Sequence, residues 1–373
     1  MHIRVRGAIV ADRLRAGIIG SGFMGRVHAQ AVRAAGAEVV AVAGSTPGSA
    51  VNAASSLGAI RAAPSAADLI AAPDVDVVHV CTPNATHLEL ASAAIAAGKH
   101  VICEKPLATT LADARALDDL ARRSDSVTAV PFVYRHYAIV REARARIANG
   151  EAGRLHLLHG SYLQDWMAES GDSNWRADLS RGGASRAFAD IGVHWCDLME
   201  FVTGHRIVRL LSSIRTVFPK RGPADQQVEV ANEDLATMLF ETDLGASGSV
   251  VVSQVSLGRK NRLQFSFDGA MASYSFDQEA PDTLLVGGRR ANTLVPRDAQ
   301  VLAPAARGYS VLPSGHPQGY QDSFNSFIGD AYAVMGGETR DGLATFSDGL
   351  RAAAITAAVL QSADARTWVE VPS

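Results

Sequence analysis

The stretch ADIGVHWCDLMEF, residues 189–201, carries three side chains that could do chemistry together: Asp190, His194 and Asp197. If the stretch is helical, Asp190 and His194 are four positions apart and His194 and Asp197 are three apart, so each pair shares a face. Such a cluster suits a metal site, a buried polar pair, or an acid–base pair that acts on a substrate. A metal needs three or four converging N, O or S ligands, and no further Cys or His cluster in the sequence supports these three.

Lysine is scarce in this chain, since only four of the 35 basic residues are Lys, at positions 99, 105, 220 and 260. An ammonium can lose its proton whereas a guanidinium cannot, so a Lys can mark a position where Arg would not serve. Lys105 stands between Glu104 and Pro106, directly after a strand predicted over His100–Cys103. Because open α/β sheets bind ligands beyond the carboxyl ends of their strands, Lys105 is placed like a proton-transfer group.

A glycine-rich turn near the N-terminus predicts a dinucleotide site. A strand over Ala16–Ile19 runs into the sequence GSGFMG, and a helical pattern follows. This is G-x-G-x-x-G in the strand–turn–helix context that dinucleotide binding requires. Gly20 allows the tight turn, Gly22 lets the backbone approach a pyrophosphate, and Gly25 lets the helix pack on the sheet with the phosphates at its positive end.

The second strand, predicted over Glu38–Ala43, bears on the choice between NAD and NADP. An NAD site usually places Asp or Glu at the end of this strand, where it accepts hydrogen bonds from the adenosine ribose. Here that position falls on Gly44, followed by Ser45 and Thr46, and no Arg stands there to bind a 2′-phosphate. The residues alone therefore leave NAD and NADP open.

The alternation of strands and helices continues through the first third of the chain. The predicted elements are strands over 75–81 and 100–103, with a helix over 86–97 between them. The tripeptides Thr82-Pro83-Asn84 and Glu104-Lys105-Pro106 follow these two strands, so we expect them to point into the cofactor cleft. For Thr82 and Asn84 the alternative, that Pro83 merely ends a strand, stays open.

After about Ala129 the parallel pattern stops, and the rest of the chain predicts a second domain. Turn signals at 243–245 and at Asp268-Gly269 predict hairpins of an antiparallel sheet. A Gly-, Pro- and Arg-rich stretch over 285–309 predicts an irregular, mobile loop. Helices are predicted over 139–149, 319–334 and 342–362.

We therefore expect an α/β protein with two domains. Residues 1–130 would form a Rossmann NAD(P)-binding domain. Residues 131–373 would form an α/β domain for substrate binding and oligomerisation, with a large open, mainly antiparallel sheet. The helices at the end of the chain could pack back on the first domain.

Two of the four tryptophans lie in the segment QDWMAESGDSNWRADLS, between the first strand of the second domain and the motif around His194. Trp166 and Trp175 alternate there with the polar residues Gln164, Asp165, Asn174 and Arg176. An aromatic face beside fixed polar groups suits a sugar ring, whose C–H face stacks while its hydroxyls form hydrogen bonds. The other interpretation is that both tryptophans are core residues under a long loop.

Composition limits the class of protein. A chain of 373 residues suits two domains, and 47% hydrophobic with 20% charged residues is typical of a globular protein. A formal net charge of −3 favours neither nucleic acid nor a membrane as partner. The three cysteines, at 81, 103 and 196, form no CxxC, which predicts reduced thiols in a cytoplasmic protein. The charged N-terminus does not suit a signal peptide, and no apolar run is long enough for a membrane span.

Taken together, the motifs resemble those of the Gfo/Idh/MocA oxidoreductases. The glycine turn, Thr82-Pro83-Asn84 with His87, Glu104-Lys105-Pro106 and Asp190-x-Gly192-x-His194 occur in that family's order and spacing over nearly the whole chain. The segments YLQDWM…NWR, IGVHWCDLMEFVTGH and HPQGYQDSF are most similar to the branch of sugar dehydrogenases around levoglucosan dehydrogenase. Many family members carry Asp where this chain has Gly44, and this departure puts the cofactor choice in doubt.

The resemblance implies the two-domain fold above and catalytic roles for Lys105, Asp190 and His194, whereas it is the count of possible ligands that predicts no metal. Residues expected at the cofactor, NAD or else NADP, are Gly20, Gly22, Phe23, Met24, Gly25, Gly44, Ser45, Thr46, Thr82, Pro83, Asn84, His87, Glu104 and Lys105. Residues expected at the substrate are Lys105, Tyr134, Arg135, Trp166, Trp175, Arg176, Asp190 and His194.

The implied reaction is hydride transfer between a secondary hydroxyl of a sugar or sugar derivative and nicotinamide. Asp190 would orient and charge-stabilise His194, His194 and Lys105 would straddle one hydroxyl, and Asp197 would be structural. Which of Lys105 and His194 is the immediate base stays open. An open sheet with a face to cover further predicts a homodimer or homotetramer.

Two rival functions fit the same fold. One is an enzyme that keeps NAD tightly bound and uses transient oxidation to eliminate or hydrolyse a glycoside. The other is a non-enzymatic regulator that senses a dinucleotide. The intact set of Lys105, Asp190 and His194 speaks against the regulator, because a sensor needs no proton path.

Overall fold

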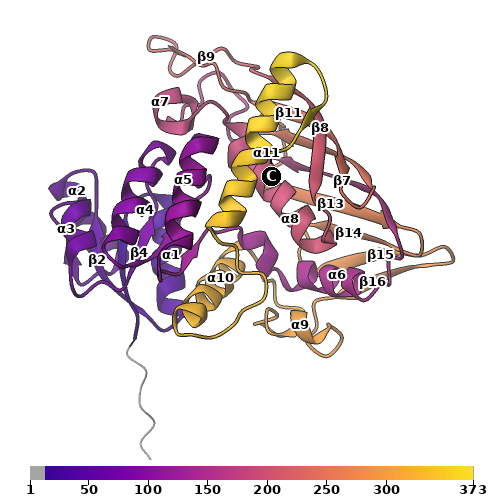
Figure 1. Ribbon diagram of the computed structural model, residues 1–373, viewed down its shortest axis with the longest axis horizontal. Coiled ribbons are helices and arrows are strands. Elements are labelled where there is room, and N and C mark those ends of the chain that lie inside the picture. The colour runs from indigo at the N-terminus through magenta and orange to yellow at the C-terminus, as the bar shows by residue number, and fades with distance from the viewer. Residues whose placement is uncertain (1–12, 373) are drawn as a thin grey trace, which may run out of the picture.

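Two large sheets organise the chain (Figure 1). The computed structural model describes residues 13–372, so most of the charged N-terminal segment considered above lies outside the described residues. Helix α11 (Phe346–Ala365), yellow in Figure 1, lies between the two sheets. None of the helices within residues 13–372 is long and apolar enough to cross a bilayer.

The first sheet is parallel and has helices on its flanks. In the order β3-β2-β1-β4-β5-β6, its strands are β1 (Arg15–Ile19), β2 (Glu38–Ala43), β3 (Arg61–Ala62), β4 (Val77–Val80), β5 (His100–Cys103) and β6 (Thr128–Ala129). The helices are α1 (Phe23–Ala34), α2 (Pro47–Leu57), α3 (Ala66–Ala71), α4 (His87–Ala96) and α5 (Leu111–Arg122). All of β4 and all but the first residue of β2 are buried, which explains their continuous apolar sequences. The strand order reverses between β1 and β4, where such sheets bind ligands.

The second sheet has nine strands and is mixed. Its order is β16-β15-β14-β13-β7-β12-β11-β8-β17, and among these described strands only the pair β7–β12 is parallel. The strands are β7 (Leu155–Leu163), β8 (Ile207–Arg215), β11 (Leu235–Thr242), β12 (Ser247–Ser253), β13 (Arg262–Gly269), β14 (Ser273–Asp277), β15 (Thr283–Gly287), β16 (Asn292–Pro296) and β17 (Val369–Glu370). Alternate residues of β13 are buried, as expected for a sheet with one covered face.

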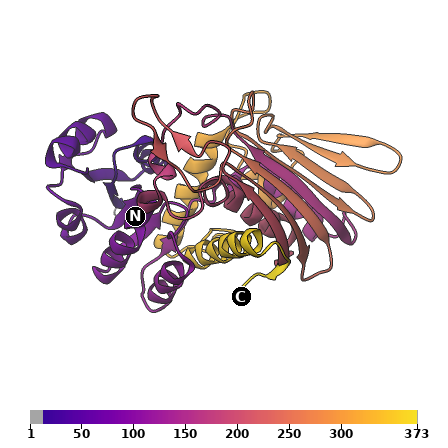
Figure 2. The same ribbon diagram turned by 90° about the horizontal axis from the view of Figure 1, so that it is seen from above.

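Helices cover one face of this sheet and leave the other bare (Figure 2). The covering helices are α6 (Ala138–Ala148), α8 (Val193–Thr203) and α11. The expected hairpin over 243–245 joins β11 to β12. The turn expected at Asp268-Gly269 lies slightly later, because β13 continues to Gly269 before β14 begins at Ser273.

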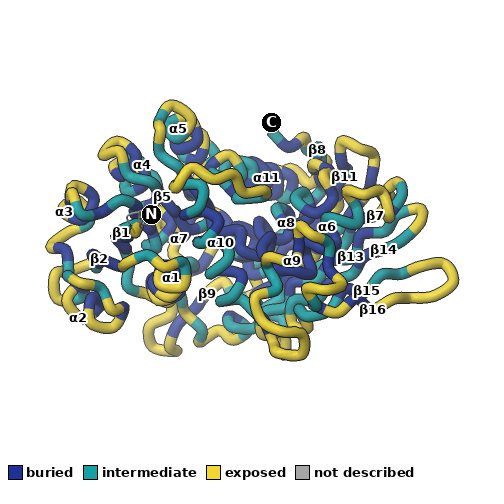
Figure 3. The backbone as a smooth tube through the Cα atoms, turned by 90° about the horizontal axis from the view of Figure 1, so that it is seen from below, coloured by how far each residue is buried: buried dark blue, intermediate teal, exposed yellow. Residues whose placement is uncertain are grey.

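The prediction of an irregular loop over 285–309 is wrong. The stretch contains part of β15, all of β16 and the short helix α9 (Pro304–Arg307), and β15 pairs antiparallel with β16. Gly287, Gly288, Arg289 and Arg290 lie at or beside the turn of this hairpin, while Leu284 and Val295 on its strands are buried. The hairpin tip projects from the end of the sheet and is exposed (Figures 2 and 3).

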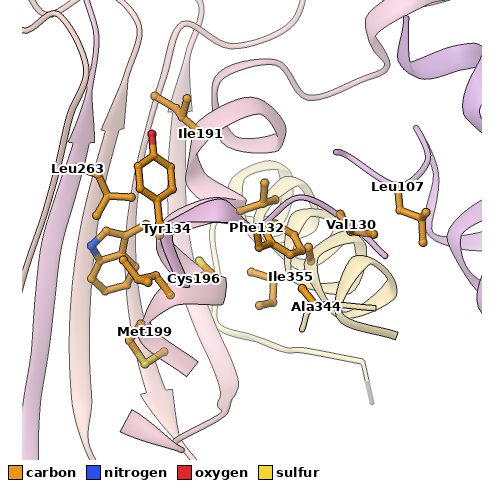
Figure 4. Close-up of a cluster of buried hydrophobic side chains, with 14 of the residues drawn as sticks. Leu107, Val130, Phe132, Tyr134, Ile191, Cys196, Met199, Leu263, Ala344 and Ile355 are labelled. Carbon is orange, nitrogen blue, oxygen red and sulfur yellow. The ribbon is translucent and has the colours of Figure 1, made fainter. Parts of the chain in front are cut away.

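Buried side chains join the two parts of the molecule. Leu107 and Val130, which follow β5 and β6, belong to one hydrophobic cluster with Ile355 of α11, and Tyr134 and Leu263 extend it to the second sheet (Figure 4). A second cluster joins α10 (Tyr320–Met335) to α1 and the first sheet. The last two helices therefore pack against the first domain as well as the second.

Candidate active site

The glycine turn between β1 and α1 has the geometry that a pyrophosphate needs. Gly20 has φ +108°, and a Cβ there would lie 2.5 Å from the carbonyl oxygen of Cys81. A Cβ on Gly25 would lie 2.2 Å from the carbonyl oxygen of Gly20, whereas one on Gly22 would meet no described atom within 4 Å. Helix α1 starts at Phe23. No side chain caps its N-terminus, and its first turn, which lies within the described residues, contains no acidic residue. Its first amides are therefore free to bind an anion, so the residues fit a dinucleotide.

The end of β2 explains why Gly44 replaces the usual acid. A Cβ on Gly44 would lie 2.3 Å from Ser49 Oγ and 2.8 Å from the backbone nitrogen of Ala50, so a larger residue would displace the start of α2. Thr46 caps that helix by accepting from the Ser49 backbone N–H at 3.1 Å. Of the residues expected at the ribose, only Ser45 is both exposed and outside this cap.

The loops after β4 and β5 are fastened to their surroundings by buried polar groups. The imidazole of His87 contacts the carbonyl oxygen of Pro106 at 2.9 Å and that of Thr82 at 3.0 Å. Asn84 Nδ2 donates to the carbonyl of Gly182 in the second domain at 2.9 Å. Asn84 and His87 therefore hold these loops in place, and their expected contact with the cofactor stays a prediction.

Glu104 is also buried and points toward the first domain. Its Oε1 lies 3.0 Å from Nε2 of His28, and the His28 ring lies 2.8 Å from the ring of His79, between their Nδ1 atoms. Burial alone would raise the pKa of Glu104, but the hydrogen bond from His28 and the nearby positive charges lower it. The carboxylate thus fixes the loop that carries Lys105.

Lys105 and Asp190 meet where the two domains face each other. Lys105 Nζ lies 2.6 Å from Asp190 Oδ1 and donates to the Asp190 carbonyl at 2.9 Å, with about 13% and 12% of the two side chains exposed. Arg176 Nε lies 3.3 Å from the same carboxylate, and Gln254 Nε2 donates to it at 2.8 Å. Burial would raise the pKa of Asp190, but the charges of Arg176 and Lys105 lower it well below its ordinary value. Asp190 is therefore a fixed carboxylate.

His194 lies in the first turn of α8, among aromatic rings. Its ring meets those of Phe132 and Tyr134 edge-to-face, with centroids 5.6 and 5.1 Å apart. Its Nδ1 is buried and has no hydrogen-bond partner among the described residues. Burial, reinforced by the charge of Lys105, lowers the pKa of His194 well below 6.5, while Asp190 opposes the shift. The imidazole is neutral at neutral pH.

The expected orientation of His194 by Asp190 is not the arrangement that the structure has. Asp190 contacts Lys105, Arg176 and Gln254, and within residues 13–372 no hydrogen bond joins it to His194. The reason is local: Phe188–Gly192, labelled η4, is a π-helix that passes into α8 at Val193. A wider turn breaks the alignment that a spacing of four gives in an α-helix.

Arg135 and Asp197 belong to a separate buried ion cluster. Arg135 Nε donates to Asp197 Oδ2 at 2.8 Å, and its Nη2 donates to Asp197 Oδ1 and, at 2.8 Å, to Asp348 of α11. The guanidinium is thereby committed to two carboxylates, so the expected substrate contact of Arg135 is not supported. Asp197 is structural here, and no group of three His, Cys, Asp or Glu in the described chain is arranged to bind a metal.

A network of hydrogen-bonded side chains, most of them at the strands of the second sheet, lies beside His194. The hydroxyls of Tyr134 and Tyr162 lie 2.5 Å apart, and Tyr162 donates to Asn261 Oδ1 at 2.8 Å. Gln164 Nε2 donates to the same oxygen at 2.7 Å and accepts from Trp166 Nε1 at 2.7 Å. Sequence reasoning missed Tyr162, Asn261 and Gln254, because only the pairing of distant strands brings them here.

The two tryptophans are half-buried on the loop that precedes η4. Trp166 lies beside a small apolar cluster of Met167, Ala177 and Val230. Trp175 lies under the guanidinium of Arg176, whose central carbon is 4.4 Å from the ring centroid. Neither ring is buried in a main core, so both remain available to a ligand.

Comparisons with known proteins agree with this geometry. The model of the oxidoreductase family with an NAD-binding Rossmann fold, GFO_IDH_MocA, matches residues 14–132, and the model of the GFO/IDH/MocA C-terminal domain matches residues 140–275. Levoglucosan dehydrogenase of Pseudarthrobacter phenanthrenivorans is 32% identical over 97% of this chain and 99% of its own length.

Two solved structures extend the likeness to three dimensions. Levoglucosan dehydrogenase in complex with NADH and levoglucosan has a TM-score of 0.90 at 31% identity, over 96% of this chain and 99% of that one. An inositol dehydrogenase homologue from Azotobacter vinelandii, with NADH and myo-inositol, has a TM-score of 0.85 at 27% identity, over 96% and 98% of the two chains. With both domain models matched and a relative above 30% identity along nearly its full length, this chain belongs to the Gfo/Idh/MocA family of oxidoreductases.

Proposed function

We propose that the protein is an NAD-dependent dehydrogenase that oxidises a secondary hydroxyl of a pyranose, an anhydrosugar such as levoglucosan, or an inositol-like polyol. The observation that carries this proposal is the buried contact between Lys105 and Asp190 just after the carboxyl end of β5, with the ring of His194 close enough for both charges to act on its pKa. The relatives named for sugar and inositol oxidation support this substrate class.

The proton and the hydride of the substrate need different acceptors. NAD bound at the glycine turn would supply the nicotinamide that accepts the hydride. Lys105, fixed by Asp190, donates a hydrogen bond to the reacting oxygen. His194, neutral at neutral pH, accepts the hydroxyl proton as the carbonyl forms. In the reverse direction the imidazolium returns that proton.

The second sheet would recognise the rest of the sugar. Arg176, Gln164 and Asn261 present donors and acceptors from the loop and the strands, and Trp166 and Trp175 present aromatic faces. Such a surface suits a neutral ring with several hydroxyls, because each hydroxyl can both donate and accept. The same surface offers an apolar face to the C–H side of the ring.

The direct test is to incubate the protein with NAD⁺ or NADP⁺ and a panel of pyranoses, anhydrosugars and inositols while recording the reduced nicotinamide that forms. We expect turnover with NAD⁺ and at least one of these polyols. Cofactor that stays bound through desalting, with elimination or hydrolysis of a glycoside and no net reduction of added NAD⁺, would instead favour the rival enzyme. Dinucleotide binding with no turnover of any polyol would favour the regulator.

We also propose that the bare face of the second sheet binds another copy of the chain, giving a homodimer or homotetramer. Leu157, Leu239 and Val251 are at least 40% exposed on this face, and a hollow of about 730 Å³ lies over β8, β11 and β12. Apolar side chains on an open sheet face favour association. Light scattering should give a mass of two or four chains, and Leu239→Arg should lower it; a monomeric wild type would contradict the proposal.

A cytoplasmic location also remains a proposal. It rests on the three free cysteines, Cys81, Cys103 and Cys196, and on the use of NAD. Fractionation of cells, followed by detection of the protein in each fraction, would test it.

A further inference from the structure

The loop that leads into β11 carries three adjacent polar side chains that are almost completely buried. Asn232, Glu233 and Asp234 are 1%, 1% and 0% exposed, and none of them lies among the residues that touch Lys105. Buried amides and carboxylates are costly unless their hydrogen bonds are satisfied. We infer that this tripeptide positions the substrate side of the active site, an inference that rests on the function proposed above.

Asn232 fixes the segment that carries Arg176. Its Nδ2 donates to the carbonyl of Arg176 at 2.8 Å and to that of Gly183 at 3.4 Å. These two carbonyls bracket α7 (Leu179–Gly182), so one amide group sets both ends of the turn. The Arg176 backbone is thereby placed so that its guanidinium can lie between Trp175 and the carboxylate of Asp190.

Glu233 fixes the start of the π-helix that carries Asp190. Its Oε1 accepts three hydrogen bonds: from Ser185 Oγ at 2.7 Å, from the Arg186 N–H at 3.0 Å and from the Phe188 N–H at 2.9 Å. One carboxylate oxygen therefore binds the entry of η4, just before Asp190. Because one oxygen accepts three hydrogen bonds from this segment, the segment has little freedom to turn Asp190 away from Lys105.

Asp234 connects this segment to the loop of Trp166. Its Oδ1 binds Nη2 of Arg186, and it accepts from Nη2 of Arg221 at 2.5 Å. Arg221 in turn donates to the carbonyls of Met167 and Glu169, both at 2.9 Å. Two buried guanidiniums on one carboxylate thus join the loop after β7 to the segment before η4.

Gln254, which follows β12, provides a further connection between Asp234 and Asp190. The backbone N–H of Gln254 donates to the carbonyl of Asp234 at 3.0 Å, and the side chain of Gln254 donates to Asp190 at 2.8 Å. The backbone of Asp234 therefore helps to position Gln254, whose side chain binds Oδ2 of Asp190. Asn232, Glu233 and Asp234 are positioning residues, because they act through groups that would touch the substrate.

The test compares Glu233→Met with Glu233→Gln in the full-length protein. Met leaves the three donors around position 233 without an acceptor, whereas the amide oxygen of Gln can still accept them. We expect Met to lower kcat for the sugar at least tenfold and Gln to restore it to within threefold of wild type. The affinity for NADH, measured by fluorescence titration, should stay within twofold in both, because the glycine turn is not touched. Glu229→Gln, exposed on β10 (Val228–Glu229), is the matched control and should change nothing.

Asn232→Leu sharpens the assignment, because its effect should fall on a different constant. It removes the donor that places Arg176, so we expect a rise of at least fivefold in KM for the sugar with a smaller change in kcat. Asn232→Leu keeps Glu233 and its three donors, so it can test the inference even if Glu233→Met does not fold. Equal losses in NADH affinity and sugar turnover, or kcat within twofold of wild type in folded Glu233→Met, would overturn the inference.

Hydrogen exchange separates this inference from the proposed function. In Glu233→Met, the amides of Arg186 and Phe188 should exchange at least tenfold faster than in wild type, whereas amides of α1 should not change. This readout needs no substrate. Unchanged exchange at these amides would refute the positioning role, while a wild-type protein that oxidises no polyol would refute the proposed function alone.

Discussion

The cofactor side and the substrate side of the cleft are built in different ways. The turn proposed to bind the pyrophosphate comes from six consecutive residues, Gly20 to Gly25, and would act through backbone amides and the absence of side chains. The proposed substrate side combines Lys105, Asp190 and Gln254, which lie far apart in the sequence, and would act through side chains held by buried partners. The first side depends on local conformation and the second on the packing of the two domains.

The largest effect should come from removing the ammonium where the two sides meet. Lys105→Met should lower kcat by a factor on the order of 10²–10³, the usual effect of removing a donor to a reacting oxygen on which charge develops, while NADH affinity changes by only a few fold. Steady-state assays measure kcat, and fluorescence titration measures the affinity for NADH. Lys220→Met, an exposed lysine on β9 (Lys220–Arg221), is the control and should behave as wild type. A Lys105→Met enzyme with near wild-type turnover would remove this residue from the mechanism.

A second test uses pH, because His194 has a lowered pKa. As pH falls, protonation of His194 removes the base, so kcat/KM for oxidation should stay level through pH 6.5 and fall only well below it. Asp190→Asn removes the carboxylate that opposes the shift, so the pKa of His194 should fall further and the acid limb should move to lower pH. His194→Asn should abolish that limb. An acid limb centred near 6.5 in wild type would contradict a buried, neutral imidazole.

The two sides also differ in how far the sequence predicts them. The strands over 38–43 and 100–103 and the helix that begins after the glycine turn lie where the sequence places them. This works because G-x-G-x-x-G needs only its neighbours, and strands buried on both faces give continuous apolar runs. The sequence also predicts Lys105 and Asp190 as members of one site, which the structure brings to 2.6 Å.

What the sequence did not predict depends on distant partners. The pairing of Asp190 with His194 followed from α-helical spacing, but the π-helix at Phe188–Gly192, bound by Glu233, changes the direction of Asp190. The sequence predicted that Arg135 would contact the sugar, but in the fold its guanidinium binds the carboxylates of Asp197 and Asp348. Asp197 and Asp348 are too far from Arg135 in the sequence for a local pattern to reveal these pairs.

A moderate effect should come from the aromatic faces on the substrate side. Trp166→Ala or Trp175→Ala should raise KM for the sugar by about three- to tenfold, which corresponds to about 0.5–1.5 kcal/mol of aromatic contact. The KM for NAD⁺ should not change, because neither ring belongs to the cofactor side. Trp368→Ala, an exposed ring near the C-terminus, is the control for the loss of an indole. Parallel loss of NAD⁺ and sugar affinity would mean that these rings stabilise the fold.

The smallest effect, a change of cofactor preference, tests whether the cofactor side can be altered without the substrate side. Ser45→Arg places a guanidinium on an exposed residue beside the end of β2, where it can bind the 2′-phosphate of NADP, so the ratio of kcat/KM for NADP⁺ to that for NAD⁺ should rise several fold.

The neighbouring positions are poorer choices for physical reasons. Thr46→Arg would remove the cap of α2, and Gly44→Asp would place a Cβ 2.8 Å from the backbone nitrogen of Ala50, so both should lower stability as well as change preference. Melting temperatures distinguish the three variants, since only Ser45→Arg should melt like wild type. An unchanged cofactor ratio in a stable Ser45→Arg enzyme would mean that the ribose lies elsewhere than at the end of β2. A large change in sugar KM in that variant would mean that the two sides are coupled more closely than their separate construction indicates.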